Sequence, residues 1–487
     1  MSNSTTAYPL WYYLCVAVSL GLFYFAWSKR HDGWGVPMIA VVGTAAVWYL
    51  LDPIYNGYET YARRFTPEVL DHAWMEVLLF LVSLGVLTPA IHNKLNADYL
   101  HKKSTIFRMM ESHELDTPYF QDQVDKLTYV VFIAFCALSF IGLMRTNFDF
   151  IGLFFPYLGE KASPWDRGRI GSGLDFLLAL AIYLQIMLNA LLGVVFALAK
   201  RPRSLILGGL GFFLATPFFL FDRTRSYMLA VLVPGLMALV ALRMKGLVLR
   251  LIVVVVGFVL MEGWFKFVID MRDQGGIAAL FAQGKMNEYK NEMKDRKHLG
   301  FNMFEELCNV NFFIDNGSYH PNFGQRYFAE LVNPVPRFLW PNKPLIGIDY
   351  AIARGMTYGN QDSSQGGVAC TVSTGMIGQG IVNFGYLFGP IAAAALMGLW
   401  VAVLARQDLQ GQKLGNLLLY SIGLVLTYNM GRDITLLIIY PFLFGWLLLL
   451  WINKNTPEML MSDEEAPETE EKKESPGLLP PNVKTPA

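Results

Sequence analysis

The stretch LILGGLGFFLATPFFLFDRTRSYMLAVLVPGLMALVALRMKG, residues 205–246, places two long apolar runs on either side of a short charged turn. The two runs, 205–221 and 227–242, have the composition of helices that cross the roughly 30 Å hydrocarbon core of a lipid bilayer. A charge in that core costs several kcal/mol unless it faces a polar site or a partner. The turn, with Arg223 and Arg225, is therefore expected at one membrane surface.

The same pattern recurs along the whole chain of 487 residues, of which 54% are hydrophobic and only 16% are charged. Soluble proteins carry about 25% charged residues. We therefore expect an all-α polytopic membrane protein with about eleven transmembrane helices. The segments cover residues 8–27, 34–51, 74–90, 129–143, 176–197, 205–221, 227–242, 251–268, 384–404, 417–428 and 436–450.

Lys and Arg predict the orientation of these segments, because cytoplasmic loops carry an excess of both. Basic clusters follow the first, third, fifth and seventh segments, at 28–31, 101–103, 199–203 and 243–246. Further basic residues follow the ninth and the eleventh segments. This alternation predicts an N-terminus outside and a C-terminus in the cytoplasm. Because no basic residue precedes Lys29, the first segment lacks the charged start of a secretory signal, and we expect it to be retained.

The segments divide the chain into four parts. Residues 1–269 hold transmembrane helices 1–8, 270–383 form a large extracytoplasmic loop domain, and 384–454 hold helices 9–11. Residues 455–487, rich in Glu, Lys and Pro, are expected to form a disordered acidic cytoplasmic tail. A connection as long as 270–383 is usually functional or disordered, and its aromatic and proline content favours order. Its basic residues include Arg272, Arg296, Arg326, Arg337, Lys343 and Arg354.

Arginines on the outer face depart from the positive-inside pattern. Arg225 and Arg432 stand at the outward-facing N-terminal ends of predicted helices, where the helix dipole already favours an anion. Guanidinium groups bind phosphate and diphosphate well, so the two turns predict an anion site. Arg225 is favoured over Arg223, because residues two apart do not share a helix face. The alternative is that Asp222 and Asp433 cap their helices while the arginines reach toward lipid phosphates.

A proline-rich motif in the outer segment adds polar groups to this prediction. In VPRFLWPNKP, residues 335–344, prolines flank Arg337, Trp340 and Lys343 and predict a rigid extended turn that holds both basic side chains. The tryptophan is suited to stacking on a sugar ring. The alternative is an aromatic anchor at the membrane interface.

The Gly-rich stretch STGMIGQGIVNFGYLFGP, residues 373–390, leads into the ninth segment. It predicts a re-entrant or closely packed helix that lines the same site, with Gln379 and Asn383 as its polar groups. Simple helix packing explains the glycines equally well, so both interpretations stay open.

Cysteine and histidine spacing indicates no zinc site, and no close pair of carboxylates resembles a two-metal site. We therefore expect neither a metal nor another cofactor, and no nucleic-acid partner. Cys308 and Cys370 both fall in the outer segment. An oxidising compartment would permit a disulfide between them, although the sequence fixes no distance.

Several of these motifs, in this order, resemble one known family. The turn DRTRS at 222–226, the long late outer segment, VPRFLWPNKP, NFG at 383–385 and GRD at 431–433 resemble the oligosaccharide repeat-unit polymerases. These are the O-antigen polymerases of the Wzy type. RFLWPNKP is the most specific element, and the likeness covers about residues 205–450.

The resemblance implies a GT-C-like glycosyltransferase of the bacterial inner (plasma) membrane. Such an enzyme joins polyprenyl-diphosphate-linked oligosaccharide repeat units into a surface polysaccharide, O-antigen or exopolysaccharide, on the outer face of the membrane. The resemblance implies that Arg225, Arg272, Arg337 and Arg432 hold the anionic donors, and that a chain-length regulator and a flippase are partners. Preorganised arginines can stabilise a diphosphate leaving group without a metal.

The acceptor sugar hydroxyl needs a general base, which we look for in the outer segment. Glu305, Glu306, His320, Asp349 and Asp362 are candidates. His320 is attractive because imidazole titrates near neutral pH. The alternative is that His320 is a surface or structural residue.

Two other functions stay open from the sequence. A glycan ligase of related architecture, which moves a finished glycan onto another acceptor, needs nearly the same arginines. A flippase or transporter of lipid-linked oligosaccharides predicts charged or broken helices at mid-membrane and internal repeats. Here the charges collect on the outer face, which favours an enzyme.

Overall fold

The structure is a computed structural model that describes residues 8–106, 117–158, 161–165, 175–221, 225–272, 302–332, 335, 339–344, 347–355, 372–410 and 414–454. Within these ranges every regular element is a helix. The predicted all-α class is therefore confirmed for the part of the chain that the structure describes. The predicted tail at 455–487 lies outside the described residues.

The N-terminal elements are α1 (Leu10–Ser28), η1 (Arg30–Asp32), α2 (Gly35–Ala45), η2 (Ala46–Leu50), α3 (Asp52–Asn56), α4 (Tyr58–Arg64), α5 (Pro67–Leu95) and η3 (Ala97–Tyr99). The middle of the chain forms α7 (Pro118–Arg145), α8 (Phe150–Phe154), α9 (Asp175–Leu198), α10 (Pro202–Leu220), α11 (Arg225–Ala238), η5 (Leu239–Arg243) and α12 (Leu247–Arg272). The C-terminal elements are α15 (Met303–Asp315), α16 (Gln325–Val332), α17 (Ile348–Ala353), α18 (Gly375–Leu409), α19 (Leu414–Met430) and α20 (Leu436–Lys454).

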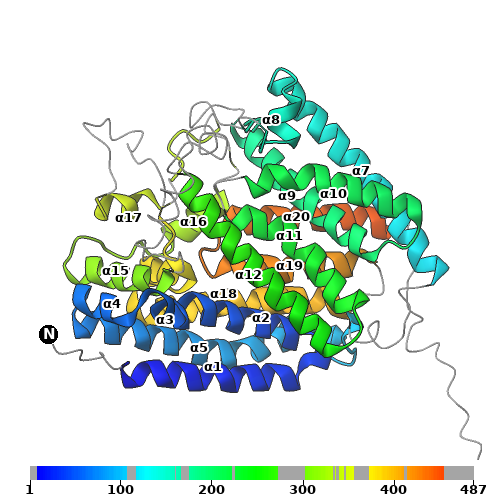
Figure 1. Cartoon of the computed structure of the whole chain (residues 1–487). Coiled ribbons are helices and arrows are strands. Elements are labelled where there is room, and N and C mark those ends of the chain that lie inside the picture. Colours follow the sequence, from blue (N-terminus) through cyan, green and yellow to red (C-terminus); the bar gives the residue numbers. More distant parts are fainter. Residues whose placement is uncertain are drawn as a thin grey trace, which may run out of the picture.

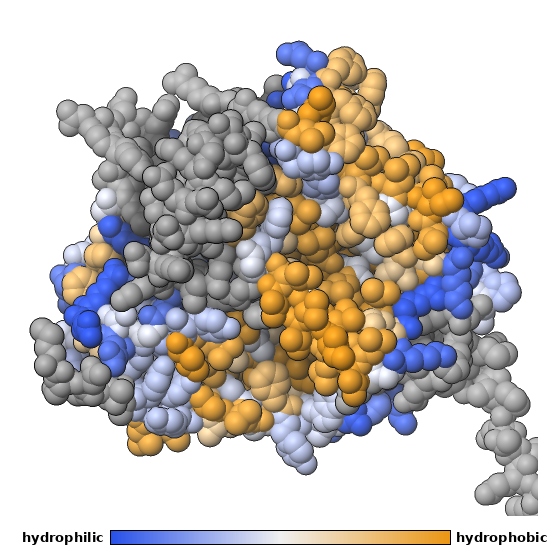
Figure 2. Space-filling model, in the orientation of Figure 1, coloured by the Kyte–Doolittle hydropathy of each residue, from blue (hydrophilic) through white to orange (hydrophobic). Residues whose placement is uncertain are grey.

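Seven of the described helices are long and apolar enough to cross a membrane. They cover Leu10–Ser28, Gly35–Asn56, Pro67–Leu95, Phe120–Arg145, Leu180–Leu198, Pro202–Leu220 and Gly375–Leu409. Shorter apolar helices lie at Tyr227–Ala238, Val248–Met261 and Ile438–Trp451. Every apolar segment expected from the sequence thus falls on a helix, and a broad apolar belt separates hydrophilic ends on the face drawn in Figure 2. These are the features of a membrane-embedded helical protein.

The most extensive contact between two helices joins α5 to α18. On α18, Ala394, Gly398 and Ala402 recur at every fourth position and are buried. A Cβ atom on Gly398 would lie 3.4 Å from the Cα atom of Thr88 on α5. Small residues at this spacing let the two backbones approach closely, which is how apolar helices gain packing energy in a membrane.

A second close approach joins α9 to α11 at a pair of glycines. A Cβ atom on Gly235 would lie 2.9 Å from the carbonyl carbon of Gly193, closer than packed atoms allow. Because the obstacle is backbone, no side-chain rotation can relieve it. The two helices α9 and α11 therefore cross where Gly193 faces Gly235.

α18 consists of two arms rather than one straight rod. Gly385 has φ 76° and ψ −176°, which are not helical values, and it separates a first arm (375–384) from a second arm (386–409). A Cβ atom on Gly380 would lie 2.2 Å from the carbonyl oxygen of Gly389. In a straight helix residues this far apart in sequence lie about 13 Å apart, so the chain doubles back at Gly385. The glycines thus pack tightly, as one sequence interpretation predicted, and the chain reverses direction within the segment.

The described parts of the predicted outer segment share the core of the bundle. α15 packs against α3, α5 and α18, and its Met303, Phe304 and Leu307 are buried in the same core as the long helices. α15, α16 and α17 gather at the end of the bundle where α1 begins (Figure 1). The first arm of α18 also belongs to the segment predicted as a loop domain, because α18 starts at Gly375 rather than at residue 384.

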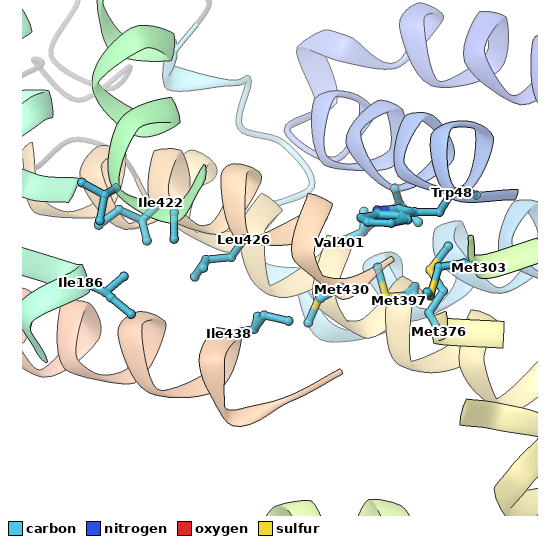
Figure 3. Close-up of a cluster of buried hydrophobic side chains, with 14 of the residues drawn as sticks. Trp48, Ile186, Met303, Met376, Met397, Val401, Ile422, Leu426, Met430 and Ile438 are labelled. Carbon is cyan, nitrogen blue, oxygen red and sulfur yellow. The ribbon is translucent and has the colours of Figure 1, made fainter. Parts of the chain in front are cut away.

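Methionines fill the core where these elements meet. Met303 of α15 and Met376 and Met397, one from each arm of α18, converge near Trp48 of η2 (Figure 3). Methionine is unbranched and adaptable, so it fills the irregular space left by a helix that doubles back. The polar groups described below lie next to this cluster of buried apolar side chains.

We predict that Gly235→Ala lowers the free energy of unfolding by about 1–3 kcal/mol, because the new methyl group meets the backbone of Gly193. Thermal unfolding in detergent measures the effect. Gly21→Ala on α1 is the matched control, since nothing lies within 4 Å of a Cβ atom there. It should leave stability unchanged or raise it slightly. Equal effects of the two substitutions would contradict the close crossing of α9 and α11.

Candidate anion-binding site

The turn between α19 and α20 is fastened to the start of α18. The N–H of Met376 donates to the carbonyl oxygen of Gly431 at 3.1 Å. The backbone N–H and the hydroxyl of Thr374 both donate to Asp433 Oδ1 at 3.4 Å. Arg432 Nε donates to the hydroxyl oxygen of Ser373 at 3.1 Å. The GRD motif is thus held by residues almost sixty positions earlier in the chain.

Gln379 and Asn383, further along the first arm of α18, make additional hydrogen bonds to neighbouring segments. Gln379 Oε1 accepts from the N–H of Ile434 at 2.9 Å, and its Nε2 donates to the carbonyl of Ile434 at 3.3 Å. Asn383 Oδ1 accepts from the N–H groups of Arg326 and Tyr327 at 3.1 and 3.2 Å. It therefore satisfies the free N–H groups at the start of α16. Both amides were candidate substrate-binding groups, and in the structure they hold neighbouring elements in place.

Arg326 is the side chain that these contacts position. It is only 3% exposed, its Nη2 donates to the carbonyl of Val372 at 3.2 Å, and Asp433 Oδ1 lies 3.6 Å away. Its Nε and Nη1 are buried and have no hydrogen-bond partner among the described residues. Gly347 presses against the guanidinium group, because a Cβ atom there would lie 3.3 Å from Arg326 Cζ. The guanidinium is therefore enclosed but incompletely satisfied.

Such an arrangement favours an anion. A buried cation is costly unless it is paired and fully hydrogen-bonded, and Arg326 has one loose carboxylate partner. Burial raises the pKa of Asp433, while the charges of Arg326 and Arg432 and the hydroxyl of Ser373 oppose that rise. The buried hydroxyl of Tyr327 also lacks a partner within the described residues. A further anion would supply acceptors for the two unused N–H groups of Arg326.

An acidic network adjoins this site. Glu306 of α15 pairs with Arg354 at 2.8 Å and accepts from the hydroxyl of Tyr350 at 2.7 Å. Burial raises the pKa of Glu306, against the opposing charge of Arg354. The Tyr350 ring packs on that of Tyr319, whose hydroxyl donates to Asp349 at 2.7 Å. These carboxylates already have donors, whereas Nε and Nη1 of Arg326 and the hydroxyl of Tyr327 have no partner among the described residues.

The acidic network also reaches the N-terminal helices. Glu305 pairs with Arg64 of α4, and Asp52 Oδ2 accepts from the N–H groups of Phe304 and Glu305. α15 is thus fixed at its first turn, where a carboxylate satisfies free N–H groups. The network ties α3 and α4 to the elements that surround Arg326.

Four of the predicted arginines fall at or beyond the limits of the described residues. Arg225 is the first residue of α11 and Arg272 the last residue of α12. Nothing is described of their side chains, and Arg223 and Arg337 lie outside the described residues. Arg432 is exposed, and it is the predicted arginine that the structure places beside Asp433 and Arg326.

The structure also describes His320, Trp340 and Lys343, whereas Asp362 lies outside the described residues. His320 is exposed and follows the buried Tyr319. Trp340 is half-buried against Phe328 of α16, with ring centroids 6.2 Å apart. Lys343 is held as expected, because its Nζ donates to the carbonyl of Val335 at 2.9 Å.

Asp433, considered from the sequence as a helix cap, accepts through Oδ1 from Thr374 at the start of α18. A disulfide that the sequence permits is not what the structure shows. Cys308 is a free thiol buried in α15, so no disulfide joins it to Cys370, which lies outside the described residues. Burial raises the pKa of the Cys308 thiol well above its usual value, which makes the thiol unreactive.

Sequence reasoning did not single out Arg326 among the basic residues of the outer segment. Its signal was the spacing of Arg326, Ala329 and Glu330, which places the three residues on one face of a helix. Periodicity alone assigns such a polar face to solvent. In the structure this face is buried, and Arg326 is the functional candidate that the sequence missed.

The fold and the site together define a helical integral membrane protein with a buried cationic site at one end of its bundle. Comparison with protein-family models, curated proteins and solved structures found no match to this chain. Among the described residues, no group of three or more His, Cys, Asp or Glu side chains is placed to hold a metal ion.

We predict that Asn383→Ala lowers the free energy of unfolding by about 2–4 kcal/mol, because it leaves the buried N–H groups of Arg326 and Tyr327 without an acceptor. Thermal unfolding without substrate measures this loss. The control is Asn316→Ala, which removes an exposed hydrogen bond to the N–H of Ser318 and should change stability by less than about 0.5 kcal/mol. If Asn383→Ala were as mild as the control, a supporting role for Asn383 would be excluded.

Proposed function

We propose that this protein is a glycosyltransferase that polymerises polyprenyl-diphosphate-linked oligosaccharide repeat units into a surface polysaccharide at the outer face of a bacterial inner membrane. The observation that carries the proposal is the buried Arg326, whose Nε and Nη1 have no partner among the described residues. A diphosphate provides the charge and the oxygen acceptors that this guanidinium lacks. The motif likeness around VPRFLWPNKP and GRD supports the same substrate class.

In the proposed reaction the hydroxyl oxygen of the acceptor sugar attacks the anomeric carbon of the donor. The bond between that carbon and the diphosphate oxygen breaks, and its electron pair leaves with the polyprenyl diphosphate. The hydroxyl proton passes to a general base, for which exposed His320 is our candidate. Negative charge grows on the leaving diphosphate, and preorganised cations stabilise it most when water is restricted.

The arginines take complementary roles in this proposal. Arg326 binds the diphosphate from inside the bundle, and the exposed Arg432 binds it from outside. Arg225, Arg272 and Arg337 are further donors to the same anion, and Trp340 stacks on a sugar. The site is at one end of a bundle with an apolar belt, which suits a substrate that is half lipid and half carbohydrate (Figure 2).

The test is a polymerisation assay with the full chain in lipid nanodiscs. The substrate is the lipid-linked oligosaccharide extracted from cells that make the native polysaccharide. We predict a ladder of products from the wild type and a rate lower by about 10²–10³ for Arg432→Ala, comparable to the loss of one transition-state donor. Arg432 is exposed, so this variant should fold; Arg326→Lys tests the buried position.

Arg63→Ala is the matched control, because Arg63 is an exposed arginine whose salt bridge is made within α4 to Glu59. It should retain the wild-type ladder. Transfer of one finished glycan to a different acceptor would identify a ligase instead. Movement of the intact lipid-linked oligosaccharide across proteoliposomes, without a new glycosidic bond, would identify a transporter.

A further inference from the structure

The short helix α16 has its polar residues inside and its apolar residues outside. Arg326, Ala329 and Glu330 are buried, whereas Phe328 is 48% and Leu331 is 72% exposed. In a soluble protein the apolar side of an amphipathic helix faces the core. The inverted arrangement is stable where the outer surroundings are hydrocarbon and the inner ones are polar.

Neighbouring side chains extend the outer side of α16. Leu339 is 68% exposed, and Trp340 packs edge-on against Phe328. We name Phe328, Leu331, Leu339 and Trp340 the α16 apolar face. Phe384, at the bend of α18, packs against Tyr327 and joins this face to the exposed Leu387 and Phe388. The apolar surface thus continues from α16 to the two-armed helix that forms the site.

The two faces of α16 are close enough for one molecule to touch both. Arg326 is the second residue of the helix, so its guanidinium lies at the N-terminal end. An eight-residue helix is about 12 Å long, and a helix with its side chains is about 10–12 Å across. The outer face and the guanidinium of Arg326 are therefore within about one helix diameter of each other, a span that one lipid molecule covers.

We propose that the α16 apolar face is the docking surface for the isoprenoid chain of a polyprenyl diphosphate, whose diphosphate is bound on the opposite face of the same helix by Arg326. The inference rests on the proposed function for its choice of lipid. This lipid is complementary to α16, because it needs one long apolar surface and one buried cation, and α16 carries both. Ordinary bilayer lipid supplies hydrocarbon for the outer face, but it gives no reason for a buried guanidinium with unused donors.

Site-specific photocrosslinking tests the proposal in the full chain. Leu331 is replaced by p-benzoylphenylalanine, and the protein in nanodiscs is irradiated with radiolabelled undecaprenyl diphosphate that carries no sugar. The control carries the same photoreactive residue at Leu20 of α1, an apolar side chain that is 63% exposed. Unlabelled undecaprenyl diphosphate and phosphatidylglycerol are the competitors.

We expect the label at position 331 to exceed that at position 20 by about tenfold, which corresponds to roughly 1.4 kcal/mol of preferential binding. Unlabelled undecaprenyl diphosphate should remove it, and phosphatidylglycerol should not. Arg326→Lys should weaken labelling at position 331 only. Equal labelling at the two positions, or equal competition by phosphatidylglycerol, would show an ordinary lipid-facing surface and overturn the inference.

The crosslinking result and the polymerisation result can fail separately. Specific labelling without a product ladder would keep the docking surface and reject the polymerase. A ladder from a protein whose position 331 is labelled no better than position 20 would keep the polymerase and reject the docking surface.

Discussion

The contact between Gly380 and Gly389 is the constraint on which the functional end of this protein depends. It lets α18 double back, so that a ten-residue arm returns against the helix that follows it. The carbonyl groups at the end of this arm accept hydrogen bonds from backbone N–H groups of the 322–324 loop. Side chains of the same arm hold α16 and the α19–α20 turn. Without two facing glycines the arm would stand away from the bundle, and Arg326 would lose the elements that enclose it.

Electrostatics gives this end of the bundle its chemical character. Carboxylates there are matched by nearby donors, such as Arg354 for Glu306. The guanidinium of Arg326 is matched less well, because Asp433 shares its Oδ1 with Thr374 and stands 3.6 Å away. A buried guanidinium with unused donors is unfavourable by itself in a mostly apolar protein. The group that costs stability is therefore also the one proposed to bind an anion, as is common at functional sites.

The sequence predicted the local structure well and the distant contacts poorly. Runs of apolar residues located each long helix, and the glycines of 373–390 indicated the tight packing of α18. Arg326 was missed because a short amphipathic helix looks the same whether its polar face points outward or inward. The direction is decided by Asn383, which is more than fifty residues away, and single-sequence reasoning supplies no such distance. The contact of Asp433 with Thr374 was missed for the same reason, since Thr374 is equally remote in the chain.

The hydrogen bonds from Arg326 and Tyr327 to Asn383 have a consequence for how the protein is made. The ribosome releases α16 well before α18, so the helix emerges without the acceptor that completes its first turn. Until residue 383 is synthesised and folded back, α16 lacks the acceptor for its first turn. Its charged side and its apolar side are then both without their final packing partners. The hydrogen bonds of its first turn therefore form only after residue 383 has been synthesised. A chain that stops before α18 would carry the sequence of the site without the means to build it.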